Sequence, residues 1–419
     1  MSCSNQIELK LAVNQANTGA DAIKRAPIVE EDTGIRCLRI GDVSNNRNFE
    51  EWGFTSADED VIEKFQLKKD DIVIARTGNT IGVVKYIDKD IKSVYNNGLI
   101  RIKINENFNP KFIYYNLISE KFKSFIYGIS AGTSTQPNMK IDHMLQYKIT
   151  DFNIEEQEKI ANILSSLDDK IELNNEMNKT LEEMSQSIFK RWFVDFEFPN
   201  EDGEPYKSSG GEMVESELGM IPKGWEVKTI GELCEVGSSK RIFMKEYVDK
   251  GVPFFRSKEI IERSKGNSIS TELFITQERF NEIKGKFGVP VKNDILLTSV
   301  GTLGVPYLVD DEEFYFKDGN LTWFKNFKEE VFRYYIYQWL LSSVGKKSID
   351  EVTIGSTQKA LTINSLKSMK LVVPNTDILD TYRKFISLNI ESIRANNKQK
   401  FTLIDLRDSL LPKLMSGKL

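Results

Sequence analysis

The stretch SAGTSTQPNMKI, residues 130–141, decides the fold, because a near copy of it, TIGSTQKALTI, occurs at residues 353–363. The triplet Ser-Thr-Gln occupies residues 134–136 and 356–358, an offset of 222 residues (356 − 134). The same offset aligns other pairs: Gly82 with Gly304, Leu99 with Leu321, Ile141 with Ile363, and Asn174 with Asn396. The chain is therefore two copies of one unit, far longer than the periods of about 20 to 50 residues that mark solenoids.

The alignment changes by one residue upstream of Gly82. DDIVIARTGNTIG, residues 70–82, matches NDILLTSVGTLG, residues 293–304, only if one residue is dropped. The repeat nevertheless continues on both sides of this point. It predicts a two-lobed protein with internal pseudo-twofold symmetry.

Length and composition allow two sizeable cores. The chain has 419 residues, of which 40% are hydrophobic, and chains of this length usually form two or three domains. No apolar run approaches the roughly 20 residues that span a bilayer, and MSCSNQIELK lacks the features of a signal peptide. We therefore expect a cytoplasmic protein with no membrane partner.

Catalytic motifs are missing from the sequence. There is no phosphate-binding loop, no Pro-Pro pair of the kind an adenine methyltransferase needs, and no acidic spacing typical of a nuclease. Three cysteines without paired spacing argue against zinc and against disulfides. His143, the only histidine, aligns with Ser365, so we expect a surface residue. The glycines of ARTGNTIG, residues 75–82, are spaced wrongly for a dinucleotide site, so we expect a structural turn.

Charge excludes one simple mode of binding. A formal net charge of −5 argues against a polycation that coats nucleic acid through bulk attraction. Local basic faces remain compatible with this total, and a protein in a larger assembly can leave much of the phosphate neutralisation to its partners.

Each copy begins with a mixed α/β (α+β) lobe built on a small sheet. Short β-branched runs bounded by Gly, Asp and Asn predict strands, and longer runs with apolar residues at helical spacing predict helices. The first lobe has predicted strands at 71–75, 82–87 and 99–104 and a helix at 110–126. The second has strands at 294–299, 305–309 and 321–325 and a helix at 329–344.

Each lobe is followed by one long amphipathic helix. Spacings of three and four place these apolar residues on one seam of the first helix: Ile160, Leu164, Leu167, Ile171, Leu181 and Ile188. The second helix, from about 377 to 411, has its seam at Tyr382, Ile386, Ile393, Leu403 and Leu410. We expect the two to pair as an antiparallel coiled coil, each roughly 50 Å long at about 1.5 Å per residue.

Two equivalent asparagines interrupt these seams. Polar residues at a seam position cost stability but fix the register of the helices. We predict that Asn174 and Asn396 lie close together near the crossing point of the two helices. The alternative is that both lie on a solvated face.

The repeat sets the expected domain boundaries. They are a first lobe at 1–152, a first helical spacer at 153–198, a linker at 199–224, a second lobe at 225–375 and a second spacer at 376–419. A duplicated lobe on a helical spacer suits an extended partner. Duplex DNA fits, because half-sites on one face recur about every 34 to 36 Å.

Several stretches resemble the specificity subunit of type I restriction-modification enzymes over essentially the whole chain. They are IEEQEKIANILSSLDDKIELNN (154–175), SIFKRWFVDFEFP (187–199), GEPYKSSGGEMVESELGMIPKGWEV (203–227), DIVIARTGNTIG (71–82) and LRDSLLPKLMSGKL (406–419). The first copy departs from this pattern, because MSCSNQIELKLAV lacks the IPKGWEV lead-in of the second. The start of the first recognition domain is therefore not fixed by the resemblance.

The resemblance implies a non-catalytic subunit with two target recognition domains, each reading one half of a split target in double-stranded DNA. The two helical regions would space these domains and dock two modification subunits, which restriction subunits with motor and nuclease activity would join. No cofactor is expected on this chain, because S-adenosylmethionine, ATP and magnesium would be bound by the partner subunits.

Candidate base-reading residues are polar, lie in predicted loops and differ between the copies. Residues common to both copies, such as the triplet Ser134, Thr135 and Gln136, cannot alone encode two different half-sites; they either hold the lobe together or contact the DNA backbone. Arg and Lys suit guanine, and Asn and Gln suit adenine. The first-lobe candidates are Arg36, Arg39, Asn45, Asn46, Arg76, Asn79 and Lys140. The second-lobe candidates are Lys240, Arg241, Arg256, Lys258, Ser299 and Lys359.

For Arg39 and Arg256 the similar surroundings in RCLRIGDV and PFFRSKEI favour a shared phosphate contact. For every candidate the alternative is a solvated surface charge. Two other functions also remain open at this point: a two-lobed scaffold that binds only proteins, and an enzyme with an unrecognised site.

Overall fold

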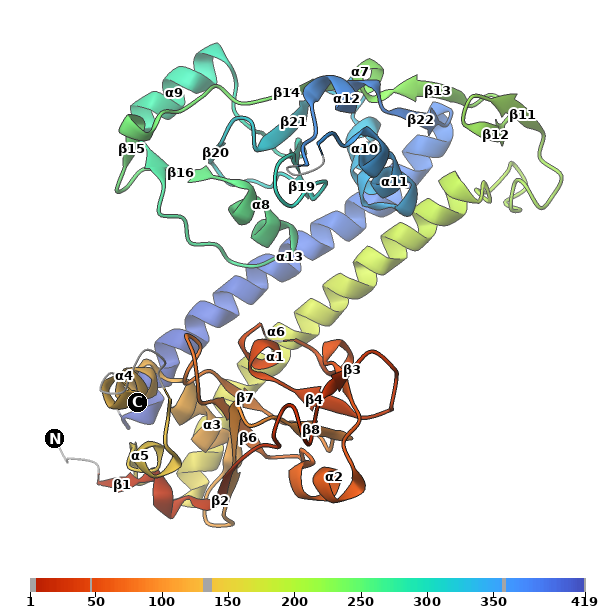
Figure 1. Cartoon of the computed structure of the whole chain (residues 1–419). Coiled ribbons are helices and arrows are strands. Elements are labelled where there is room, and N and C mark those ends of the chain that lie inside the picture. The colour runs from red at the N-terminus through yellow and green to blue at the C-terminus, as the bar shows by residue number, and fades with distance from the viewer. Residues whose placement is uncertain (1–4, 46, 131–137, 356–358, 418–419) are drawn as a thin grey trace. The chain divides into compact units, whose positions relative to one another are not determined.

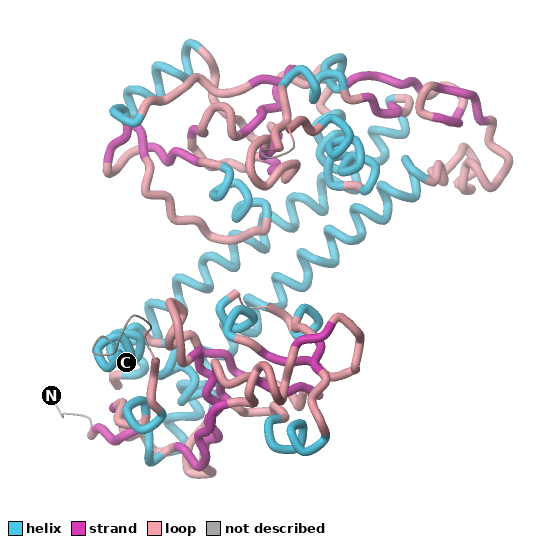
Figure 2. Tube along the Cα trace, in the orientation of Figure 1, coloured by secondary structure: helices cyan, strands magenta, loops and turns pink. Residues whose placement is uncertain are grey.

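The computed structural model describes residues 5–45, 47–130, 138–355 and 359–417. Two compact units divide the chain: unit 1 comprises residues 1–171 and 402–419, and unit 2 comprises residues 172–401. Each unit combines short strands with helices and contains part of two long helices, α6 and α13 (Figures 1 and 2). Among the described residues, no helix is long and apolar enough to cross a membrane. The predicted α/β (α+β) fold with two repeated lobes is confirmed.

Unit 1 is built on two four-stranded sheets, ordered β2-β9-β6-β7 and β3-β5-β4-β8, with β1 paired to β10. The strands are β1 Gln6–Glu8, β2 Val13–Thr18, β3 Ile28–Val29, β4 Arg36–Leu38, β5 Phe54–Thr55, β6 Ile72–Ala75, β7 Val84–Tyr86, β8 Ser93–Tyr95, β9 Leu99–Ile104 and β10 Lys148–Thr150. The helices are α1 Ile40–Ser44, α2 Glu59–Phe65, α3 Pro110–Ile118, α4 Glu120–Ser130 and α5 Ile141–Met144, with 3-10 turns η1 Leu9–Leu11 and η2 Phe49–Glu51.

Unit 2 repeats this topology with sheets ordered β14-β21-β18-β19 and β15-β17-β16-β20 and with the pair β13-β22, which corresponds to β1-β10; it adds the pair β11-β12. The strands are β11 Met213–Ser216, β12 Gly219–Pro222, β13 Glu226–Thr229, β14 Glu235–Gly237, β15 Tyr247–Val248, β16 Val252–Phe255, β17 Phe274–Ile275, β18 Ile295–Thr298, β19 Pro306–Leu308, β20 Tyr315–Phe316, β21 Leu321–Lys325 and β22 Lys370–Val373. The helical segments are α7 Ile230–Leu233, α8 Ser257–Ser264, α9 Gln277–Lys286, α10 Val331–Leu341, α11 Ser343–Val352, α12 Ile363–Ser368, the π-helical turn η3 Lys190–Val194 and η4 Met244–Glu246.

The central strand of each unit is buried on both faces. Every residue of β6 and of β18 is buried, which explains why both read as continuous apolar runs without alternation. In unit 1, β6 lies between β7 and β9, both antiparallel to it. In unit 2, β18 lies between β19 and β21 in the same way. These two predicted strands therefore lie in the core of their units.

A serine breaks each helix that periodicity predicts to be continuous. Ser119 has extended backbone (ψ 150°) between α3 and α4, and its hydroxyl accepts a hydrogen bond from the Phe122 amide at 3.3 Å. Ser342 does the same between α10 and α11, where it accepts from the Gly345 amide at 3.1 Å. The single helices predicted at 110–126 and 329–344 are wrong, because a capping serine starts a second helix in each copy.

The long helices are α6, Ile154–Phe189, and α13, Thr376–Met415. Within unit 1, Leu164 of α6 packs in one cluster with Leu411 and Leu414 of α13, and Arg407 donates to Asp168 at 2.8 Å. The predicted seam residue Leu410 is only partly buried there, so the C-terminal seam of α13 runs one position later than the heptad count suggests.

Within unit 2 the two helices run antiparallel. The Asn174 amide donates to Gln399 Oε1 at 2.9 Å, and Asn389 donates to the Ser185 hydroxyl at 3.0 Å. Asn174 is fully buried, and its Nδ2 also contacts the Asn396 carbonyl at 3.4 Å. The two asparagines that the repeat predicts to lie together are thus in contact, and the proposed role in fixing register stays a prediction.

The predicted linker region carries an aromatic stack within unit 2. The ring of Phe198 lies 4.6 Å from that of Tyr206 and 4.8 Å from that of Trp225, both stacked. Phe193 and Phe198 are buried. The hairpin of β11 and β12 therefore begins from an anchored segment rather than a loose tether.

Candidate nucleic-acid interface

Four segments of unit 1, three loops and the short helix α1 with its caps, meet at the ends of its strands. We call them rim 1: Arg39–Asn45, Arg76–Asn79, Asn96–Gly98 and Asn138–Lys140. Backbone hydrogen bonds join them in order, from the Asn96 amide to the Leu38 carbonyl (3.1 Å), from the Arg76 amide to the Gly98 carbonyl (3.0 Å) and from the Met139 amide to the Arg76 carbonyl (2.9 Å). Most of the polar residues predicted from the first copy therefore gather on one bonded set of loops.

Unit 2 has the same arrangement, which we call rim 2: Arg256–Lys258, Ser299–Thr302, Lys317–Asn320 and Lys359–Leu361. The Lys317 amide donates to the Phe255 carbonyl (2.9 Å), the Ser299 amide to the Asn320 carbonyl (2.8 Å) and the Leu361 amide to the Ser299 carbonyl (3.0 Å). Each bond has its counterpart in rim 1. The two units thus present different side chains on one backbone frame.

A buried carboxylate holds the arginine that precedes the first helix of each rim. Arg39 Nε lies 3.2 Å from Asp42, and Arg256 Nη2 lies 2.9 Å from Glu259. Burial disfavours ionised Glu259, but the hydrogen bonds from Arg256 outweigh that effect and lower the pKa of its carboxyl. About a third of the side chain of each arginine is exposed to solvent. This equivalence suits the shared phosphate contact expected for Arg39 and Arg256.

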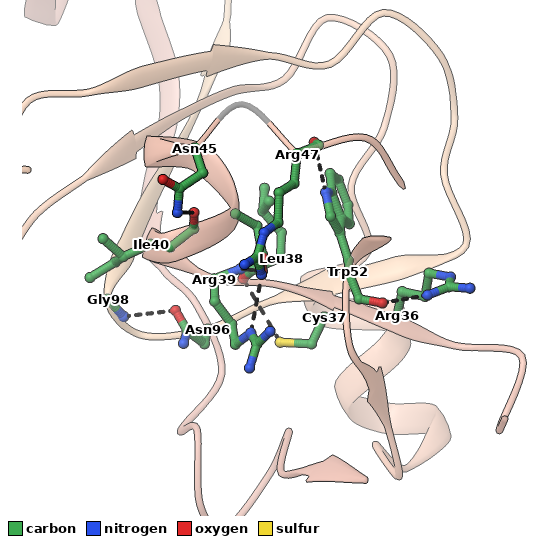
Figure 3. A network of polar contacts seen from close by, with 12 residues as sticks. Arg36, Cys37, Leu38, Arg39, Ile40, Asn45, Arg47, Trp52, Asn96 and Gly98 are labelled. Carbon is green, nitrogen blue, oxygen red and sulfur yellow. Dashed lines mark hydrogen bonds and ion pairs between the residues drawn. The ribbon is translucent and has the colours of Figure 1, made fainter. Parts of the chain in front are cut away.

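The Arg36 side chain makes its contacts within unit 1. Its guanidinium lies 4.0 Å from the ring centroid of Phe54 and 5.6 Å from that of Phe49, and it donates to the Trp52 carbonyl. Figure 3 shows Arg36 turned toward Trp52 at the side of β4 away from Asn45. These contacts explain the residue as a structural cation–π anchor, and we remove it from the candidate base readers.

The remaining candidates of unit 1 lie on rim 1 and are mostly exposed. Asn45 ends α1, and its Nδ2 donates to the Gly41 carbonyl at 2.8 Å, which leaves its oxygen outward (Figure 3). Asn79 and Lys140 are exposed on their loops. Asn46 and the triplets 134–136 and 356–358 lie outside the described residues.

Arg76 is held by a neutral partner. Its Nε and Nη2 donate to Asn138 Oδ1 at 3.2 and 3.0 Å. Among the described residues, no carboxylate pairs with it, whereas Arg39 is paired with a buried aspartate. The positive charge of Arg76 is therefore not offset locally.

The candidates of unit 2 are more often paired with acids. Arg241 Nε lies 2.7 Å from Asp318, and Lys258 lies 3.4 Å from Glu259. The Lys240 amide donates to the Tyr315 hydroxyl at 2.6 Å, and its ammonium lies 5.2 Å from the ring of Phe287. Lys359 is exposed. All four remain available to a partner through exposed side chains.

Ser299 does not qualify as a base reader. It is 3% exposed, and its hydroxyl shares a 2.7 Å hydrogen bond with Thr322 and lies 3.2 Å from the Leu297 carbonyl. A polar residue after a strand looks like a loop residue in sequence, but here the strand β21 and the segment ending at Leu361 cover it. Ser299 instead lines a pocket with Ser238, Ser239, Asp318, Thr322 and Leu361.

The sequence interpretation missed two parts of the rims. Asn138 was not singled out, although it orients Arg76. The turn Asn96–Gly98 was not singled out either, although Asn-Asn-Gly is a turn signal. An added Cβ at Gly98 would lie 2.5 Å from Cδ1 of Ile40, so the Ile40 side chain would have to move.

The chemistry of the rims is that of donors. Arginines, lysines and amides can bind the acceptor-rich edges of bases and phosphates. Among the described residues, no group of three or more His, Cys, Asp or Glu side chains could hold a metal ion. The donors on the two rims therefore suit recognition of a nucleic acid.

Comparison with known proteins gives a consistent result. The family model for the type I restriction modification DNA specificity domain matches residues 19–183 and 222–400. The type I restriction enzyme MjaIX specificity subunit of Methanocaldococcus jannaschii is 30% identical over 327 residues, 77% of this chain and 72% of that protein. The HindI specificity subunit of Haemophilus influenzae is 24% identical over 444 aligned positions, covering 91% and 94% of the two chains.

A solved structure supports the fold. The crystal structure of a type I restriction-modification S subunit from M. genitalium aligns with a TM-score of 0.55 and 17% identity, and covers 98% of this chain and 96% of that chain. At this identity the likeness speaks for the architecture alone.

Proposed function

Because the chain belongs to the family of type I restriction-modification DNA specificity proteins, we propose that it selects the DNA sequence on which such a complex acts. Each unit would read one half of a split target in double-stranded DNA. The observation that carries this proposal is the pair of rims, which share one set of backbone hydrogen bonds and differ in side chains. A common frame with different polar groups is what reading two different half-sites requires.

The paired segments of α6 and α13 would form the docking site for two modification subunits, which restriction subunits then join. The chain itself would catalyse no step. S-adenosylmethionine, ATP and magnesium would be bound by those partners, and the complex would act in the cytoplasm. The acidic total charge of this chain is compatible with that division, because the partners can supply much of the phosphate neutralisation.

The test is to co-express the chain with its modification subunit, purify the complex and locate methylated adenines in host DNA by sequencing. A split motif with a fixed gap is the expected result. Replacing residues 225–375 with the equivalent lobe of a relative should change one half of that motif and leave the other half intact.

Two outcomes would contradict the proposal. A stable complex that methylates nothing, with no affinity for DNA, would favour a protein-binding scaffold. Turnover or cofactor binding by the isolated chain would favour an enzyme with its own site.

A further inference from the structure

Arg76 and Asn138 of unit 1 occupy the same positions in the backbone frame as Ser299 and Ala360 of unit 2. Strand register gives the first equivalence, because Ala75 pairs with Leu99 in β6-β9 and Thr298 pairs with Leu321 in β18-β21. An isolated bridge gives the second, because Thr77 pairs with Asn138 and Val300 pairs with Ala360. One site in the fold therefore carries an Arg–Asn pair in one unit and a Ser–Ala pair in the other.

In unit 1 this site presents an oriented cation. Two N–H groups of the Arg76 guanidinium point at one amide oxygen, Asn138 Oδ1. A guanidinium has five N–H donors, so three remain. Asn138 fixes the plane of the group without neutralising it, unlike Asp42 beside Arg39 or Asp318 beside Arg241.

In unit 2 the side chains of the two equivalent residues offer no free donor. The Ser299 hydroxyl is buried and shared with Thr322. Ala360 has no polar side chain, so neither member of an Arg–Asn pair exists there. Space is left instead, because Ser299 lines a pocket together with Leu361.

We propose that Arg76 reads a guanine in the half-site of unit 1, that Asn138 is its positioning residue, and that the equivalent site of unit 2 reads no guanine. An arginine donating two hydrogen bonds to the O6 and N7 atoms of guanine is the commonest specific contact in the major groove. The inference rests on the proposed function and adds a specificity determinant to it.

The first test is Arg76→Ala in the complex with the modification subunit, read by sequencing of methylated adenines. We expect one guanine position in one half of the motif to become degenerate. Its preference over the other bases should fall by roughly 5- to 150-fold, which corresponds to about 1–3 kcal/mol per bidentate contact. The half read by unit 2, assigned by the lobe replacement, serves as the internal control.

A second pair of variants tests the positioning role. Asn138→Gln keeps a neutral amide acceptor and should keep part of the guanine preference, whereas Asn138→Leu removes the acceptor and should relax the preference at the same position as Arg76→Ala. Lys148→Ala, which removes one exposed charge from β10 away from rim 1, is the matched control and should leave all preferences unchanged.

The reciprocal test grafts the pair into unit 2. Ser299→Arg combined with Ala360→Asn should add a preference for guanine in the other half-site. The single change Ala360→Asn should add none, because it supplies no guanidinium.

Three results would overturn the inference while leaving the proposed function standing. They are a wild-type motif with no fixed guanine in the unit 1 half, an equal loss of methylation at all sites in Arg76→Ala without altered preference, and equal behaviour of Asn138→Gln and Asn138→Leu. A wild-type complex that yields no split motif would overturn both.

Discussion

The two units bury an aspartate at the same place and satisfy it in different ways. Asp71 of unit 1 lies 3.8 Å from the guanidinium of Arg101, both with side chains less than 5% exposed. Asp294 of unit 2 accepts a 2.8 Å hydrogen bond from the indole of Trp323. Burial raises the pKa of both carboxyls. Duplication kept the backbone frame, and the side chains around it changed together to suit each core.

This comparison explains why the repeat is clear in sequence but incomplete. Arg101 aligns with Trp323, a substitution of a cation by an aromatic that no similarity score favours. It is tolerated because each still places an N–H near the same buried carboxylate. The rims tolerate different side chains for a similar reason. Their segments are joined by backbone hydrogen bonds, which do not depend on the identity of the side chains.

The largest expected effect is the difference in stability loss between alanine variants of the two buried aspartates, Asp71 and Asp294. Asp71→Ala leaves Arg101 as a buried charge without its partner and should cost about 3–5 kcal/mol. Asp294→Ala leaves two neutral donors, the Trp323 indole N–H and the Val291 amide, without their acceptor and should cost about 1–3 kcal/mol. Hydrogen exchange of the β6 and β18 amides measures the free energy of opening of each unit separately.

Asp71→Asn is the control for the first variant, because it keeps the shape and removes the charge. Equal losses for Asp71→Ala and Asp294→Ala would show that Arg101 is not held by Asp71 and would remove the distinction between the two cores.

A middle-sized effect concerns the arginine that precedes α8. Glu259→Gln should cost unit 2 about 1.5–3 kcal/mol at neutral pH, the range for hydrogen bonds to charged groups. The pKa of Glu259 is lowered from 4.5 in the folded protein. Its contribution is therefore present in full above pH 4.5 and is lost as the pH falls through the folded pKa.

Exchange of the α8 amides at pH 7 and at stepwise lower pH checks this. The gap between wild type and Glu259→Gln should close on the acid side. Asp42→Asn should produce a similar loss in α1 at neutral pH, and a gap that widens in acid would contradict the assignment of Glu259.

The smallest expected effect is the loss of stability on removing a helix-capping serine, which should be similar in the two units. Ser119→Ala and Ser342→Ala each remove one helix-capping hydroxyl and should cost about 1 kcal/mol, typical of an N-cap serine. Amide exchange in α4 and α11 measures the losses. Threonine at either position should recover most of the stability, and a loss confined to one unit would mean that the two helix breaks have different causes.

The sequence was sufficient for three strands of each unit, for the long helices and for the contact between Asn174 and Asn396, because periodicity and the repeat are local or self-aligning signals. It missed the other strands, including the second four-stranded sheet of each unit. It failed at Ser119 and Ser342, where apolar spacing continues across the break and only the hydroxyl geometry stops the helix. It also retained Ser299, because burial by β21 depends on strand pairing that the sequence pattern does not reveal.

Asn138 could not be found from the pattern. It lies 62 residues from Arg76 in the sequence, and its importance follows from a bridge between two loops. Arg36 was retained as a candidate for a related reason, since the ring of Phe54 is brought opposite it by the pairing of β4 with β5.

The most direct test of the account is a structure of the assembled complex on its mapped DNA target. The account predicts that rim 1 faces one half-site and rim 2 the other, with Arg76 within hydrogen-bonding distance of a guanine and Ser299 away from any base. DNA contacts made through other surfaces, or through one rim only, would contradict it.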